Sequence, residues 1–144
     1  MKTDPREMVG RPFDSLGYAP TAYVEEFRGW HTDEGMEPDW TVELHDGSMQ
    51  FLLTKQRYVV TIFVLSEQLI SEVVGVSART ATIRDVLAKH GSSTTFGPET
   101  ESPLLGRKGA WLRYGNPREV THLEFNVGGF GIHMLTLMAP EHAP

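Results

Sequence analysis

Two histidines and a glutamate flank a Gly-Gly pair in the stretch HLEFNVGGFGIHML, residues 122–135. Imidazole and carboxylate groups can hold a metal ion or move protons, so His122, Glu124 and His133 are candidates for such chemistry. Three ligands on one flat face, without a fourth from a helix, are a weak metal signal. The same residues would also suit the solvated side of a β-hairpin, and the sequence favours that interpretation.

The Gly128-Gly129 pair predicts the register of this hairpin, because two glycines are a favoured two-residue turn. Apolar side chains are then expected to share one face, with Leu123 opposite Met134 and Phe125 opposite Ile132. The other face is expected to carry His122, Asn126 and the pair Glu124–His133. A third possibility is that this polar face contacts a partner.

A second candidate site is the acidic region of the first half. Between residues 25 and 46, eight acids accompany a single base, Arg28, and aromatic rings lie among them. An aromatic anchor surrounded by charges is typical of protein interfaces, whereas adjacent carboxylates repel one another and hold a metal weakly. We therefore predict partner-binding roles for seven residues: Glu25, Glu26, Trp30, Asp33, Glu34, Glu37 and Asp39.

The net charge of −6 is unevenly distributed along the chain. Residues 1–72 carry 13 acids and 6 bases, whereas residues 73–144 carry 6 acids and 7 bases. Nucleic-acid phosphates require cations, so such a surface excludes nucleic acid as the expected partner and favours a basic protein. A homodimer is compatible with this expectation.

No pattern of a known enzyme class is present. The chain has no G-x-S-x-G elbow, phosphate-binding loop, H-E-x-x-H or EF-hand loop. It has no cysteine, which excludes thiolate nucleophiles and thiolate metal sites. The sequence therefore predicts neither catalysis nor a cofactor or metal.

The composition is that of a globular protein, with 144 residues, 40% hydrophobic and 22% charged. No apolar run is long enough to span a membrane, and residues 1–10 lack the apolar core of a signal peptide. A cytoplasmic protein without a membrane partner is expected.

Several elements can be placed from periodicity. Asp46-Gly47 lies between two alternating runs and predicts a hairpin over 39–54, in which Val42 faces Phe51 and Trp40 faces Leu53. The apolar run 58–65 predicts a central strand. Residues 4–17 predict an interrupted helical stretch, and residues 91–109 a long loop.

A helix is predicted over 82–91, where apolar positions recur at helical spacing. Thr82 is the expected N-cap with Asp85 three residues later, and Gly91 is expected to take the left-handed cap at the C-terminus. His90, at the apolar edge, is expected to be a half-buried packing residue.

Runs of strands with few helices predict an α+β fold built on an antiparallel sheet in one domain, residues 1–144. The halves 1–72 and 73–144 could be an αβββ duplication. Residues 51–65 align without gaps to 123–137, and Trp40 corresponds to Trp111.

Four stretches carry a resemblance to a known family: VGRPFDSLG (9–17), MEPDWTVELHDGSMQFLLT (36–54), IRDVLAKHG (83–91) and AWLRYG (110–115). In this order they resemble the small immunity proteins encoded beside bacteriocins of the pyocin and colicin type and other bacterial toxins. The resemblance implies a cytoplasmic, often acidic protein that binds one toxin domain and blocks it.

The sequence thus favours a non-enzymatic immunity protein that neutralises a basic toxin, such as a nuclease, through an acidic surface. The alternative is a small-molecule- or metal-binding domain, enzymatic or not, that uses His122, Glu124 and His133. That alternative requires the 91–109 loop to cover the polar face of the sheet.

Overall fold

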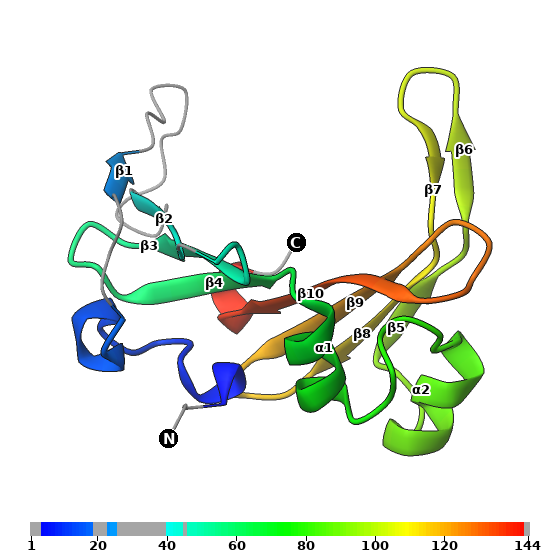
Figure 1. The fold of residues 1–144 in the computed structure, drawn as a ribbon, viewed down its shortest axis with the longest axis horizontal. Helices are drawn as coiled ribbons and strands as arrows, with labels where there is room; N and C mark the ends of the chain where they lie inside the picture. Colours follow the sequence, from blue (N-terminus) through cyan, green and yellow to red (C-terminus); the bar gives the residue numbers. More distant parts are fainter. Residues whose placement is uncertain (1–3, 19–22, 26–39, 45, 143–144) are drawn as a thin grey trace.

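The computed structural model describes residues 4–18, 23–25, 40–44 and 46–142, with 23–25 and His142 described by their main chain alone (Figure 1). These residues form an eight-stranded antiparallel sheet with two α-helices, which confirms the α+β fold. From edge to edge the strands are β1 (Tyr23–Glu25), β2 (Trp40–Glu43), β3 (Met49–Leu53), β4 (Val59–Val64), β10 (Ile132–Met138), β9 (Val120–Phe125), β8 (Trp111–Gly115) and β5 (Thr95–Gly97).

Each half of the chain supplies half of this sheet. Read inward from the two edges, the orders are β1-β2-β3-β4 and β5-β8-β9-β10, and the halves meet where β4 pairs with β10. Trp40 and Trp111 begin the corresponding strands β2 and β8. Each half therefore contributes four strands to this sheet. Three of them were expected in each half, and the fourth is the edge strand, β1 in the first half and β5 in the second. The duplication itself stays a prediction.

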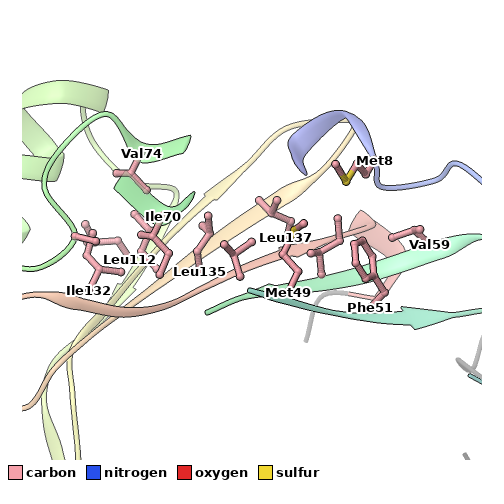
Figure 2. Close-up of a cluster of buried hydrophobic side chains, with 14 of the residues drawn as sticks. Met8, Met49, Phe51, Val59, Ile70, Val74, Leu112, Ile132, Leu135 and Leu137 are labelled. Carbon is pink, nitrogen blue, oxygen red and sulfur yellow. The ribbon is translucent and has the colours of Figure 1, made fainter. Parts of the chain in front are cut away.

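The hydrophobic core lies on one face of the sheet. Helices α1 (Glu67–Val74) and α2 (Ile83–His90) both lie on this side (Figure 1). Ile70 and Val74 of α1 point toward Leu135 and Leu112 of the strands, and Met8 approaches the other end of the same cluster (Figure 2). Fully burying one such side chain contributes about 1.5–3 kcal/mol, so this cluster holds the helices against the sheet.

Helix α2 confirms the predicted N-terminal capping. The Thr82 hydroxyl accepts from the Asp85 N–H, and the Asp85 carboxylate accepts from the Thr82 N–H at 2.9 Å. Gly91 caps the helix with a φ of 81°, which favours glycine, but its ψ of −169° shows that it does not adopt the expected left-handed cap. His90 is more exposed than predicted, and its ring Nε2 lies 2.5 Å from the Val74 carbonyl oxygen at the end of α1.

The sequence did not lead us to expect helix α1. Its apolar residues follow the apolar strand β4 almost directly, so the two elements read as one hydrophobic region. The available signal was local: the Ser66 hydroxyl accepts from the Leu69 N–H, and Gly75 closes the helix with a φ of 82°.

The N-terminal helical stretch is two separate 3₁₀ turns, η1 (Pro5–Glu7) and η2 (Phe13–Leu16). The segment between them runs beside β4, where the Gly10 N–H donates to the Val59 carbonyl at 2.7 Å and the Val59 N–H donates to the Arg11 carbonyl at 2.9 Å. This main-chain pairing replaces the hydrogen bonds that a continuous helix would have made.

The β2–β3 hairpin has the predicted register, with Val42 opposite Phe51 and Trp40 opposite Leu53. The β9–β10 hairpin keeps the predicted Phe125–Ile132 pair and then shifts by one residue. A β-bulge at His133 absorbs the extra residue, so Glu124 faces Met134 and Leu123 faces Leu135. The predicted Leu123–Met134 and Glu124–His133 pairings are therefore wrong.

Residues 91–109 are more ordered than the predicted loop. They contain the edge strand β5 and a separate hairpin of β6 (Thr100–Ser102) and β7 (Gly106–Lys108). This hairpin rises from the end of the sheet on the side away from the helices (Figure 1). A third 3₁₀ turn, η3 (Pro140–His142), follows β10.

Leu137 tests the placement of the core, because it is fully buried in the central strand β10. We expect Leu137→Ala to lower the free energy of unfolding by about 2–5 kcal/mol, since the truncation leaves a cavity. The same change at Leu105, which is 87% exposed, is expected to stay within about 0.5 kcal/mol of the parent protein. Urea denaturation measures both; equal losses would contradict this placement.

Candidate functional site

The face of the sheet opposite α1 and α2 is called here the helix-free face. Strand alternation and register place one continuous row of side chains across it, each opposite the next on the neighbouring strand. In order from β2 to β5, this cross-strand row is Glu43, Gln50, Phe63, Thr136, His122, Arg113 and Thr95.

The cross-strand row is accessible along most of its length. Its two ends, Glu43 and Thr95, are exposed, and Gln50, Phe63, His122 and Arg113 are half-buried. Thr136 at the centre is buried, with a side chain 6% exposed. The row therefore has a carboxylate at the β2 end and a guanidinium near the β5 end, with an aromatic ring between them.

Trp111 and His122 pack against each other on the helix-free face. Their rings lie 5.2 Å apart between centroids at an interplanar angle of 31°. A side chain at Gly97 would collide with the Trp111 indole, so the glycine opposite Trp111 leaves room for the ring. The Arg113 guanidinium lies 5.4 Å from the Trp111 ring, which is cation–π geometry.

Arg113 also determines the protonation state of the His122 ring. Arg113 Nε donates to His122 Nδ1 at 3.3 Å, which requires Nδ1 to be an unprotonated acceptor. Burial lowers the pKa of His122 below its ordinary value, and the positive charge of Arg113 lowers it further, while Glu124 acts in the opposite direction. A neutral imidazole is thus the favoured form beside this arginine.

Glu124 and His133 are brought together despite the register shift. His133 Nε2 lies 3.7 Å from Glu124 Oε1, with the histidine 44% exposed and the glutamate 12% exposed. His122 instead engages Arg113 and Trp111. Within residues 4–18, 40–44 and 46–142, no three histidine, aspartate or glutamate side chains converge as metal ligands. The three residues of the alternative site therefore divide into two separate contacts.

The β6–β7 hairpin borders the helix-free face and carries two strongly exposed leucines between its strands. Leu104 is 93% exposed and Leu105 87% exposed. Glu99 Oε1 accepts from the Gly128 N–H, which joins the base of the hairpin to the β9–β10 loop. Large apolar side chains exposed in pairs often mark a contact surface.

The seven predicted partner-binding residues fall outside the described side chains. Glu25 is placed by its main chain at the sheet edge, opposite Trp40, and the other six lie outside the described residues. The structure adds residues that sequence reasoning missed, chiefly Gln50, Phe63, Trp111 and Arg113. The available signal was the alternation in Trp111-x-Arg113 and His122-x-Glu124, which places these side chains on a common face once β8 and β9 pair.

No family model and no curated protein matches the chain. Among solved structures it is similar to a DUF4309 family protein, YjgB from Bacillus subtilis. The sequence identity is 13% and the TM-score 0.44, over 90% of this chain and 72% of that one. A likeness this distant carries no functional inference. Among the described residues, no helix is long and apolar enough to cross a membrane.

The pKa of His122 provides a test of this geometry. Because the folded protein binds fewer protons at His122 than the unfolded chain, the stability gained from the neutral ring is present above the unfolded pKa, about 6.5, and is lost as pH falls through the folded pKa. Arg113→Met removes a nearby positive charge, so we expect the His122 pKa to rise toward its unfolded value. The loss of stability on acidification should then become smaller and be complete at a higher pH.

NMR titration of the His122 ring measures the pKa directly. Arg84→Met on the exposed surface of α2 is the matched control, and it should leave the His122 titration unchanged. An unchanged His122 pKa in Arg113→Met would show that the Arg113–His122 contact is not formed.

Proposed function

We propose that this protein is a non-enzymatic cytoplasmic inhibitor that binds a basic toxin domain and blocks it, as the resembling immunity proteins do. The observation that carries the proposal is the helix-free face, where a half-exposed cross-strand row begins at the acidic side of the sheet. Seven of the eight strands contribute described side chains to this face or its edge, which offers a broad docking area.

Charge supports a basic partner. Residues 25–46 hold eight acids and one base, and the described part of this segment places Glu43 and Asp46 on exposed positions of β2 and the β2–β3 turn. Glu25 is anchored by its main chain in the adjacent edge strand. A concentrated field of one sign raises the association rate of an oppositely charged protein.

Apolar side chains would supply the anchors that give the proposed interface most of its affinity. Phe63 lies half-buried in the middle of the cross-strand row, and Trp111 lies half-buried on the same face. Leu104 and Leu105, between the strands of the bordering hairpin, are strongly exposed. Interfaces derive most of their affinity from a few such anchors, whereas charged residues at the rim chiefly set rate and specificity.

The rival small-molecule site at His122, Glu124 and His133 has weaker geometric support. Its side chains engage different neighbours, and the β6–β7 hairpin rises away from the sheet instead of lying over it (Figure 1). A catalytic site needs groups that converge on one reacting atom. The described residues of this region favour a surface for a partner.

The acidic region can be tested through association kinetics. Affinity purification from the native host, washed at low and then high salt, would identify the toxin partner. Reversing Glu25, Glu26, Asp33 and Glu34 to Lys is then expected to slow association about tenfold or more, because the steering field is removed. Stopped-flow mixing at low salt measures the rate.

The control is a second quadruple reversal with the same change in net charge, at the exposed residues Glu7, Glu67, Glu72 and Glu141, which lie outside residues 25–46 and outside the β6–β7 hairpin. This control should retain most of the association rate. Equal slowing in both quadruple variants would mean that only net charge matters and would remove the acidic region as the docking site.

The helix-free face can be tested with one substitution on each side of the sheet. Gln50→Arg adds bulk and positive charge to the cross-strand row, and we expect it to weaken binding of the same partner about tenfold or more. Gln68→Arg makes the same change on exposed α1, on the helix-covered side, and should alter affinity less than about twofold. Calorimetry measures both; stronger weakening by Gln68→Arg would place the interface on the helical side.

A further inference from the structure

Glu119 is a buried acid that the proposed interface does not use. Its side chain is 8% exposed, and its Oε2 atom is buried without a hydrogen-bond partner. Leaving a buried carboxylate oxygen unpaired is costly, since the oxygen loses its water and gains nothing in return. Such an atom in a folded protein requires an explanation.

The β8–β9 turn holds Glu119 in this position. Asn116 Oδ1 accepts from the Arg118 N–H at 2.8 Å and from the Glu119 N–H at 2.9 Å. The Asn116 N–H in turn donates to the Glu119 carbonyl at 3.0 Å. These three hydrogen bonds, two of them to the main chain of Glu119, fix the turn from which the glutamate side chain is directed into the protein.

Glu119 lines a cleft on the helix-covered side of the sheet. The cleft has a volume of about 180 Å³ and lies between η1, the ends of α1 and α2, and strands β8 and β9. Val73, Val74 and Leu123 give it an apolar wall, and Tyr114 lines it as well.

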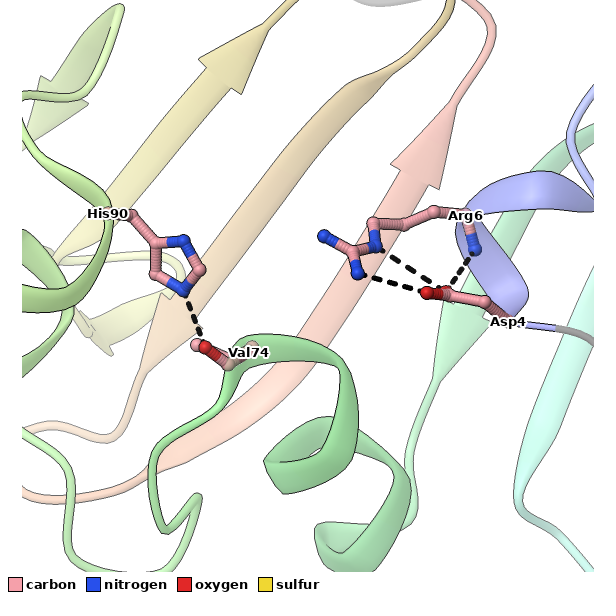
Figure 3. Close-up of polar contacts among 4 residues, drawn as sticks. All are labelled: Asp4, Arg6, Val74 and His90. Carbon is pink, nitrogen blue, oxygen red and sulfur yellow. Dashed lines mark hydrogen bonds and ion pairs between the residues drawn. The ribbon is translucent and has the colours of Figure 1, made fainter.

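Arg6 and His90 also line the cleft, but each already has another partner. Figure 3 shows Arg6 turned toward Asp4, with Arg6 Nη2 2.9 Å from Asp4 Oδ2. It also shows His90 reaching from α2 to the end of α1, where its Nε2 lies 2.5 Å from the Val74 carbonyl. Both residues line the cleft, yet neither pairs with Glu119 Oε2.

The local charges leave the carboxylate available to an external donor. Burial raises the pKa of Glu119, as does Asp4, while Arg6 and Arg118 lower it. Asp4 neutralises Arg6 within their ion pair, so Arg6 is a weak partner for a second acid. A cation that enters the cleft would meet a desolvated acceptor, and hydrogen bonds between ionised groups are the strong ones.

We propose that this cleft binds a primary ammonium group carried on a short apolar chain. The ammonium donates to the Glu119 carboxylate, and the methylene groups lie against Val73, Val74 and Leu123. A free small amine and the lysine side chain of another protein share this chemistry. The site lies on the opposite side of the sheet from the cross-strand row, so it stands independently of the proposed toxin interface.

The test titrates the full-length protein with n-butylammonium and follows the backbone amides of the cleft by NMR. We expect saturable shifts at Val73, Val74 and Thr121 with a dissociation constant in the millimolar range, which five non-hydrogen atoms can supply. n-Butanol, which has the same chain without the charge, should bind about tenfold more weakly or worse. Nα-acetyl-lysine methylamide distinguishes the two possible ligands. If it binds at least as tightly as n-butylammonium, the ligand is a lysine side chain of another protein. If it binds more weakly, the ligand is a free small amine.

Glu119→Gln removes the charge and keeps the shape, so it should weaken n-butylammonium binding about tenfold or more. Glu101→Gln on exposed β6 is the matched control and should bind as the parent does. Circular dichroism and thermal unfolding verify that both variants fold. The absence of saturable binding to the parent protein, equal affinity for butanol, or unchanged affinity in Glu119→Gln would each overturn the proposal.

Discussion

The antiparallel pairing of β4 with β10 is the constraint on which the rest of the structure depends. Val64 lies opposite Leu135 and Ile62 opposite Leu137, so the apolar rows of the two halves become one continuous core. Without this pairing, each half would present an unpaired central strand with exposed main-chain groups. Among the described strands, the edges of the joined sheet are instead β1 and β5, each three residues long.

The same pairing creates the helix-free face. Because side chains alternate along a strand, joining the apolar rows on one side must also join Phe63 to Thr136 on the other. The bulge at His133 then brings Met134 and Thr136 onto the face occupied by Glu124 and His122. A continuous surface therefore extends from the acidic first half to Arg113 in the second.

The parts of this fold that sequence could predict are those set by local chemistry. Asp46-Gly47 determines the register of the β2–β3 hairpin, and Thr82 with Asp85 determines the start of α2. The bulge at His133 could not be predicted, because Gly128-Gly129 suits an unshifted hairpin and only pairing with β4 requires Leu135 and Leu137 on the core side. Likewise, nothing near Glu119 in the sequence indicates burial, which depends on helices distant in the chain. The partner-binding roles of the acidic residues stay predictions, as do the duplication and the immunity function.

The central claim is that a basic partner docks on the helix-free face. Cross-saturation NMR on the complex tests it most directly, because saturation passes from the partner only to protons at the interface. The account predicts signal loss at Gln50, His122 and Arg113, with little change at Gln68 and Glu72 of α1. Signal loss concentrated on α1 and α2, with the cross-strand row unaffected, would contradict it.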